Sequence, residues 1–200
     1  MNRHHRALAL VLAVIVSAPL AGCGGAHGTE TPSSAAQRGD AQAIARKYDA
    51  YSEGYTELID IIFGLKQAYA HYRALGIAKA DPDRDLYFNA ADTSVRHAIE
   101  SLRTGRTIPV DDAAAADRAA DALLPTLERI QHRYDTLVPY YATKAYRQDR
   151  LARGRAEDAA LLSDYETALK DMDRLGRELE SYRRTSRSRA VASAQSEASR

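Results

Sequence analysis

The stretch from Ile44 to Tyr72 reads IARKYDAYSEGYTELIDIIFGLKQAYAHY. Its apolar and aromatic residues recur in alternating steps of four and three, which places them on one narrow stripe of an α-helix. A helix with such a stripe needs partner helices that carry stripes of their own. We therefore expect a continuous helix from about Ala41 to Leu75, stopped by Gly76. Its inward residues would be Ile44, Tyr48, Tyr51, Tyr55, Leu58, Ile62, Leu65, Tyr69 and Tyr72.

A second and a fourth helix are predicted from their start and stop signals. The second begins at Asp81-Pro82, because Asp is a preferred N-cap and Pro suits the first helical position, and it ends at Gly105. The fourth spans about Ala156 to Tyr182, after a break at Gly154. The inward residues of the second are Phe88, Ala91, Val95, Ala98, Ile99 and Leu102, and those of the fourth are Leu162, Tyr165, Leu169, Met172, Leu175, Leu179 and Tyr182.

The third helix is predicted to open at Asp111 or Asp112. Pro125 and Pro139 lie inside its apolar pattern, and an interior proline removes a backbone hydrogen bond, so we expect a helix that bends twice and ends near Leu151. Together the four helices predict an all-α fold, an antiparallel four-helix bundle with long, partly kinked helices over residues 41–182. The seam of the third helix is Ala116, Ala120, Leu123, Leu127, Ile130, Tyr134, Leu137 and Tyr141.

The N-terminus carries an export signal rather than part of the bundle. Basic residues up to Arg6 precede an apolar run from Ala7 to Leu20, which is too short to span a membrane. The run ends in Leu20-Ala21-Gly22-Cys23, which resembles the lipobox of bacterial lipoproteins. That resemblance implies removal of residues 1–22 as a signal peptide and acylation of Cys23, with palmitate among the acyl chains. The alternative is an ordinary signal peptide followed by an unrelated cysteine.

The sequence also predicts the cellular location of the mature chain. Cys23 is the only cysteine, so no disulfide would form if it carries lipid. Residues 23–40 are rich in Gly, Ser, Thr and Pro and are expected to form a flexible tether. Gly24 rather than Asp follows the cysteine, which by resemblance to Gram-negative lipoproteins favours the outer membrane, facing the periplasm. The membrane would thus be the first partner of the protein.

Charge limits the remaining partners. The chain has 28 Lys and Arg against 27 Asp and Glu, and this near balance, with the predicted compartment, argues against nucleic acid. Residues 183–200 lack an apolar face and are expected to form a disordered basic tail. The tail is interpreted as solvated, with contact to anionic lipid headgroups as the alternative. The sequence leaves the oligomeric state open.

A family resemblance rests on a segment near the second interior proline. Leu124-Pro125 is followed by Tyr140-Tyr141, Lys144, Tyr146 and Asp149, and Lys47 to Tyr51 opens the first helix in a similar way. This pattern resembles the YiiG-like family of bacterial lipoproteins, a domain of unknown function. The resemblance covers about Ala41 to Tyr182. It implies a helical domain behind a lipoprotein signal and carries no activity with it.

Two readings of that segment stay open. Tyr140 and Lys144 are expected to share one helix face, and Tyr146 and Asp149 another. The polar groups either satisfy backbone freed by Pro139, a structural role, or form a recognition surface for a ligand or an envelope protein partner. The candidate ligand or partner face is therefore Tyr140, Lys144, Tyr146 and Asp149.

The sequence contains little that predicts catalysis. It has no Gly-x-Ser-x-Gly, no phosphate-binding glycine motif and no cysteine besides Cys23, so no enzyme activity and no cofactor are expected. Glu128 and His132 are four residues apart and could present two metal ligands, but an exposed ion pair or a solvated face is the preferred interpretation. The tyrosine stripe of the first helix is interpreted as core, with a ligand groove as the alternative.

Two functions follow from these readings. The first is a non-catalytic, membrane-anchored interaction or scaffold protein of the cell envelope. The alternative is a periplasmic module that binds a small ligand or metal through the tyrosine seam or the Glu128 and His132 face. A filled seam with an exposed apolar patch would favour the first, and a large concave pocket with converging polar groups would favour the second.

Overall fold

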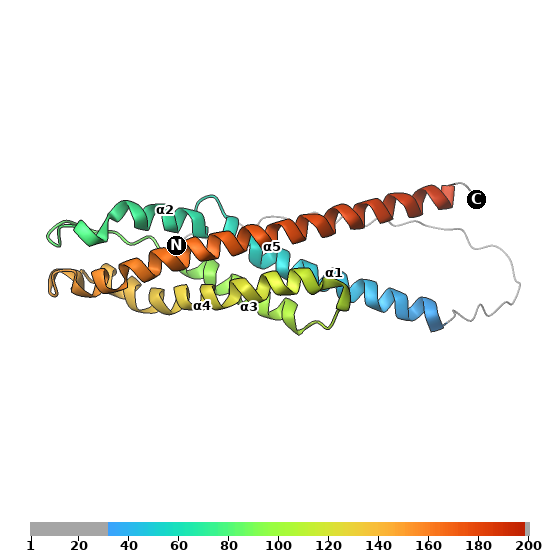
Figure 1. Cartoon of the computed structure of the whole chain (residues 1–200), viewed down its shortest axis with the longest axis horizontal. Coiled ribbons are helices and arrows are strands. Elements are labelled where there is room, and N and C mark those ends of the chain that lie inside the picture. Colours follow the sequence, from blue (N-terminus) through green and yellow to red (C-terminus); the bar gives the residue numbers. More distant parts are fainter. Residues whose placement is uncertain (1–31, 199–200) are drawn as a thin grey trace, which may run out of the picture.

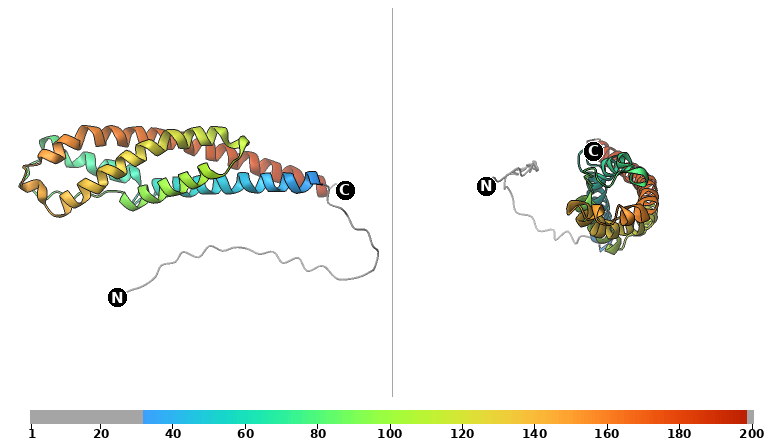
Figure 2. Two further views of the ribbon diagram at one scale, coloured as in Figure 1. Left: turned by 90° about the horizontal axis from the view of Figure 1, so that it is seen from below. Right: turned by 90° about the vertical axis from the view of Figure 1, so that its left-hand side faces the viewer.

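The protein folds as an all-helical bundle, which confirms the predicted fold class; the computed structural model describes residues 32–198. Its helices are α1 (Pro32–Ile59), α2 (Leu65–Leu75), α3 (Asp92–Thr107), α4 (Ala114–Ala142) and α5 (Ala152–Ala198). The chain runs up and down one long axis, with α1 and α2 sharing the first pass (Figure 1). Seen along that axis, the passes surround a common centre (Figure 2). α1 packs on α3 and α5, and α4 packs on α3 and α5, as in an antiparallel bundle.

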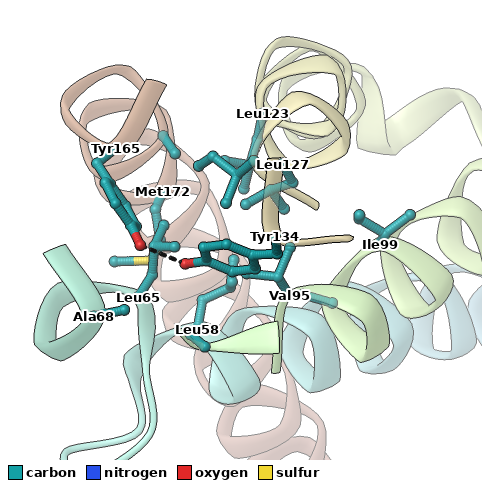
Figure 3. Close-up of a cluster of buried hydrophobic side chains, with 14 of the residues drawn as sticks. Leu58, Leu65, Ala68, Val95, Ile99, Leu123, Leu127, Tyr134, Tyr165 and Met172 are labelled. Carbon is teal, nitrogen blue, oxygen red and sulfur yellow. Dashed lines mark hydrogen bonds between the residues drawn. The ribbon is translucent and has the colours of Figure 1, made fainter. Parts of the chain in front are cut away.

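The first pass is broken, where the sequence predicted one continuous helix. α1 ends at Ile59 and α2 begins at Leu65, so residues 60–64 form a link between the two. Ile62, predicted to point inward, is 61% exposed. The prediction failed because the helical spacing of apolar residues continues through the link, although cap residues within the link end the helix. Leu58 and Leu65, on either side of the link, do point into the core, as predicted (Figure 3).

α1 also begins earlier than expected. The segment 23–40 was predicted as a tether, yet the helix starts at Pro32. Proline suits the first helical turn, and the following Ala, Gln and Arg are good helix formers, which explains the early start.

The second pass is a helix over only part of its length. Asp81-Pro82 starts a turn rather than a helix: the carboxylate of Asp81 accepts the Asp83 N–H at 2.9 Å, and its carbonyl accepts the Arg84 N–H at 3.2 Å. Asp-Pro is a turn signal as well as a helix signal. The chain then runs without helix until α3 begins at Asp92. Phe88 and Ala91 are buried as predicted, although they precede the helix.

The third pass of the bundle continues through both interior prolines but ends earlier than predicted. A short 3-10 turn, Asp111–Ala113, leads into α4, which contains Pro125 and Pro139. The helix ends at Ala142 instead of near Leu151, because Lys144 turns the chain into the left-handed region with φ of 58°. The predicted seam residues of α4 are all buried: Ala116, Ala120, Leu123, Leu127, Ile130, Tyr134, Leu137 and Tyr141.

The fourth pass is longer than predicted at both ends. α5 begins at Ala152 and includes Gly154, which was predicted to break the chain. A Cβ at Gly154 would lie 2.6 Å from the Tyr141 hydroxyl, so this glycine allows the two helices to approach closely. At the other end α5 continues to Ala198, where a disordered tail was expected from residue 183. Ala, Arg, Gln and Glu in this segment favour a helix even without an apolar face.

Aromatic side chains fill the centre of the bundle. Tyr134 and Tyr165 are fully buried, and their hydroxyls lie 2.7 Å apart, so one phenol donates a hydrogen bond to the other (Figure 3). Phe88 packs against Tyr134 and Tyr72, with ring centroids 5.7 and 5.4 Å apart. Tilted and edge-on aromatic pairs of this kind add to the free energy gained by burial. Among the described residues, none of the helices has an apolar run long enough to cross a bilayer.

Candidate functional site

Among the residues whose exposure the structure describes, the largest group of exposed apolar side chains lies in the link between α1 and α2. We call residues 59–64 the knuckle. Ile61 is 82% exposed, Ile62 61% and Phe63 65%, and Ile59 beside them is 45% exposed. Single exposed apolar residues are common, but a contiguous group of large ones marks an interaction surface. The knuckle is therefore the first candidate for a functional site.

The backbone of the knuckle is held in one shape by Asp60. Its carboxylate accepts the N–H groups of Ile62 at 2.8 Å and Phe63 at 2.6 Å, and its carbonyl accepts the Gly64 N–H at 3.0 Å. The hydrogen bonds from Phe63 and Ile62 hold the pKa of Asp60 below its ordinary value. The carboxylate is therefore charged at neutral pH, and the exposed apolar side chains stand on a fixed turn.

Gly64 allows this turn to close. A Cβ at this position would lie 2.3 Å from the carbonyl oxygen of Asp60 and 2.6 Å from that of Leu58. Both are backbone atoms, which cannot move aside as a flexible side chain can. Any larger residue at position 64 would force the link between α1 and α2 to change shape.

The sequence contains a signal for the knuckle, but the helical spacing of the apolar residues was given more weight in the prediction. From Ile59 to Phe63 four of five successive residues are large and apolar, more than one helix face can bury. Asp60 is a preferred cap residue, and Gly64 is a turn residue. Reading these cap and turn residues ahead of the four-three spacing would have separated α1 from α2.

The predicted site around Tyr140 and Asp149 forms a connected corner after α4. The Tyr140 hydroxyl donates to Asp149 at 2.8 Å, and the other carboxylate oxygen accepts the Arg153 N–H at 3.1 Å. Burial, with the hydrogen bond to Asp149, raises the pKa of Tyr140 to about 12. Burial alone would raise the pKa of Asp149, but the bonds from Tyr140 and Arg153 hold it below its ordinary value. Asp149 thus supports the first turn of α5.

The other two predicted residues contact the turn after α2. Tyr146 is fully buried; its hydroxyl accepts the Leu86 N–H and donates to the Arg84 carbonyl, each at 3.1 Å. Lys144 is 52% exposed and pairs with Asp85 at 2.6 Å. The expected faces are not formed, because α4 ends before Lys144: Tyr140 pairs with Asp149, not with Lys144. These side chains contact one another and the backbone, which is the geometry of a structural corner.

Glu128 and His132 line the same surface hollow, but among the described residues no further His, Cys, Asp or Glu joins them as a metal ligand. Glu128 pairs with Arg103 of α3 at 2.8 Å, and both side chains are well exposed. Within residues 32–198 no group of three or more His, Cys, Asp or Glu is arranged to hold a metal ion. The surface ion pair is the interpretation that the sequence favoured.

The tyrosine stripe of the first pass is packed rather than open. Tyr51 and Tyr72 are fully buried, and Tyr48 stacks on Tyr182 of α5 with ring centroids 3.7 Å apart. Tyr55 and Tyr69 are half-buried, and the Tyr69 hydroxyl donates to Glu166 of α5 at 2.9 Å. These contacts support the core interpretation over the ligand groove.

A buried ionic cluster joins α1, α3 and α4. Lys47 is 2% exposed and lies 2.8 Å from Asp117, which also accepts a hydrogen bond from Tyr51 and pairs with Arg106 at 2.7 Å. Burial would raise the pKa of Asp117, but the hydrogen bonds from Lys47 and Tyr51 hold it below its ordinary value. Each charge has a partner, so the cluster fixes helices rather than offering a free reactive group.

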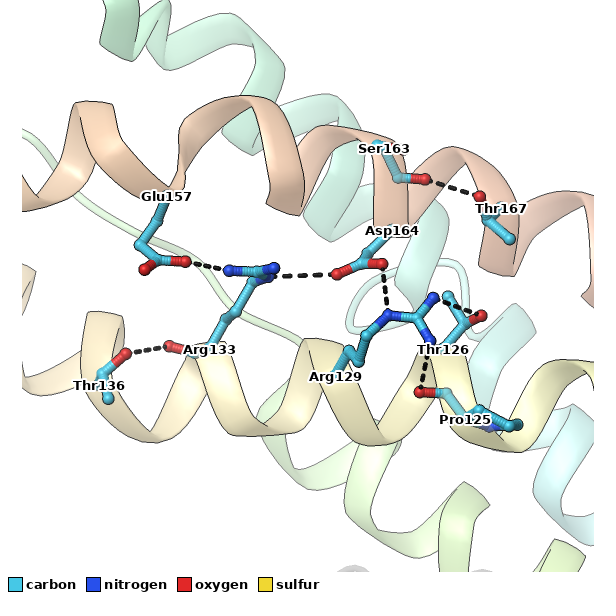
Figure 4. A network of polar contacts seen from close by, with 9 residues as sticks. All are labelled: Pro125, Thr126, Arg129, Arg133, Thr136, Glu157, Ser163, Asp164 and Thr167. Atoms are coloured by element: carbon cyan, nitrogen blue, oxygen red, sulfur yellow. Dashed lines mark hydrogen bonds and ion pairs between the residues drawn. The ribbon is translucent and has the colours of Figure 1, made fainter.

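A second polar network lies between α4 and α5 (Figure 4). Asp164 accepts hydrogen bonds from Arg129 at 2.9 Å and Arg133 at 3.2 Å. Arg133 also binds Glu157, and Arg129 continues to the Thr126 hydroxyl. The charged side chains of this network are again paired with one another, as expected for contacts that fix the position of one helix along the other.

The comparisons with known proteins add no relative. No family model matches the chain, and no match was found among curated proteins or solved structures. The resemblance to the YiiG-like family therefore stays a prediction from the sequence. Residues 1–22 and Cys23, the predicted signal peptide and lipidation site, lie outside the described residues, as does the first part of the predicted tether.

Proposed function

We propose that the chain is a membrane-anchored lipoprotein of the cell envelope whose helical domain works by contact and not by catalysis. Acylated Cys23 holds it to the membrane, by the lipoprotein pattern at the outer membrane facing the periplasm. The domain is a rigid bundle that presents the knuckle to its surroundings.

The observation that carries this proposal is the pairing of a filled seam with one exposed apolar turn. The tyrosines and the ionic groups inside the bundle contact one another, and the apolar residues of the knuckle contact nothing comparable. Such an arrangement costs solubility without stabilising the fold, so a binding role explains it best. The sequence pattern at Leu20 to Cys23 supplies the anchor.

The anchor is tested by feeding labelled palmitate to cells that produce the full chain. We expect the label in the wild-type protein and in the membrane fraction. Cys23→Ala should carry no label and keep its signal peptide. A wild-type protein without label would contradict the anchor.

The contact role is tested by a photoreactive amino acid in place of Ile62 in the membrane-bound chain. We expect crosslinked adducts, with lipid or with protein, at this position. His132 of α4 gives the matched control, because it is exposed and lies beside Arg96 and Arg103 of α3 rather than beside the knuckle. Equal crosslinking at positions 62 and 132, or none at 62, would reject the contact role.

A further inference from the structure

We propose that the partner of the knuckle is the lipid bilayer itself: Ile61, Ile62 and Phe63 enter the outer edge of the hydrocarbon and fix how the anchored domain lies on the membrane. This inference rests on the proposed function, because it names the partner of that same contact surface. It assigns the knuckle a lipid surface and not a protein pocket.

The directions of the three side chains favour a fluid partner. Ile61, Ile62 and Phe63 are successive residues on a tight turn, and each is more than half exposed. Successive side chains on a turn do not share one flat face, so a fluid layer accommodates them more readily than a flat protein surface does. Hydrocarbon accepts apolar side chains in any direction, and aromatic and aliphatic residues are the ones that peripheral proteins place at the membrane boundary.

Hydrogen bonds within the turn satisfy much of the donor capacity of the knuckle's backbone. A bilayer offers no water to satisfy backbone N–H groups, and each unsatisfied group is costly there. The N–H groups of Ile62, Phe63 and Gly64 all donate to Asp60, within the turn. The exposed carboxylate of Asp60 accepts two of these hydrogen bonds. The tip can therefore enter the outer edge of the hydrocarbon with the N–H groups of Ile62 and Phe63 already paired.

Chain lengths allow this geometry together with the Cys23 anchor. The residues from Gly24 to Thr31 span at most about 30 Å. α1 has 28 residues, and at 1.5 Å per residue it separates its start from the knuckle by about 42 Å. An anchor near the start of α1 and an apolar tip at its end would hold this helix along the membrane surface at two points.

A second copy of the chain is a poorer occupant. A stable dimer buries about 800 Å² on each partner, which one turn with four exposed apolar residues does not provide. The knuckle also projects outward, whereas a homodimer contact of this size would need a matching hollow.

The chain contains no tryptophan, so Phe63→Trp creates a single reporter in the full acylated protein. The protein is reconstituted in phosphatidylethanolamine and phosphatidylglycerol vesicles, with or without brominated acyl chains. We expect blue-shifted emission from residue 63 and loss of intensity in the brominated vesicles. His132→Trp, an exposed ring-for-ring change on α4, should emit at long wavelength and keep its intensity. Adding Ile61→Ser and Ile62→Ser to Phe63→Trp should reduce the quenching.

Each other result decides against the proposal. Long-wavelength, unquenched emission from residue 63 means that the knuckle stays in water. Blue-shifted but unquenched emission means that a protein surface covers it. Labelled palmitate counted in the same sample separates failure of the lipid contact from failure of the anchor. Labelled protein with unquenched emission from residue 63 overturns the lipid contact and keeps the anchor. Quenching in unlabelled protein keeps the lipid contact and overturns the anchor.

Discussion

At the scale of single residues, one carboxylate makes a buried lysine tolerable. Lys47 is nearly inaccessible to solvent, and Asp117 is its partner. Removing one member of a buried ion pair leaves the other charge uncompensated and costs about 3–5 kcal/mol. We expect Asp117→Asn to lower the free energy of unfolding by about that amount, measured by urea denaturation. Asp121→Asn is the matched control: Asp121 is 52% exposed, pairs with Arg106 alone, and should matter little.

The same variant should change the response to acid. The pKa of Asp117 is lower in the folded chain than in the unfolded one, so in acid the unfolded chain binds the extra proton. The contribution to stability is fully present above the unfolded pKa and is lost as pH falls through the folded pKa. Urea midpoints of Asp117→Asn should therefore decline less between about pH 5 and 2 than those of the wild type. An equally steep decline would show that Asp117 is not a source of acid sensitivity.

Asp149 tests whether the corner after α4 is structural. Its carboxylate accepts the Tyr140 hydroxyl and caps α5 at Arg153. Loss of a helix cap and a partly buried hydrogen bond should cost about 1–2 kcal/mol, read as a lower urea midpoint for Asp149→Ala. Asp85→Ala removes an exposed carboxylate that pairs with Lys144 and Arg147 and should leave the midpoint unchanged. An unchanged midpoint for Asp149→Ala would favour the recognition surface.

At the scale of the element, the break between α1 and α2 depends on Gly64. A Cβ there would lie against backbone carbonyls, so Gly64→Ala should lower the free energy of unfolding by about 1–3 kcal/mol, as overpacking does. Gly39 of α1 is exposed and has no atom within 4 Å of an added Cβ. Gly39→Ala should therefore stabilise the helix, by up to about 1 kcal/mol. Circular dichroism and urea midpoints measure both changes, and a neutral Gly64→Ala would contradict the turn as described.

Elements were predictable where apolar spacing and packing agree. The seam of α4 was predicted residue by residue, because its apolar positions keep one face inward through both prolines. The second pass was only half predictable: Asp81-Pro82 favours a turn and a helix alike, and the choice depends on contacts that Tyr146 and Lys144 make from far along the chain. The knuckle was not predicted because Ile62 falls at a position that fits the helical spacing. In the structure, Asp60 and Gly64 nevertheless end the helix there.

At the scale of the whole molecule, the bundle and the end of α5 contribute differently to stability. The core residues of α5 end at Leu179 and Tyr182, and of the side chains described beyond them only Ser186 is half-buried while the rest are exposed. A helix without buried apolar side chains gains little from tertiary packing and is marginal on its own. Residues beyond Arg184 are thus expected to add helix content but no stability to the bundle.

A chain shortened to residues 40–184 tests this separation. It should keep the urea midpoint and cooperative melt of the longer chain, since every core residue remains. Its total helical circular dichroism should fall by the contribution of the removed helix ends. Leu58→Ala in the shortened chain checks that the measured melt reports the core, because deleting this fully buried side chain should cost about 2–5 kcal/mol. A lower midpoint on shortening alone would mean that the ends of α1 and α5 stabilise the bundle through contacts with each other.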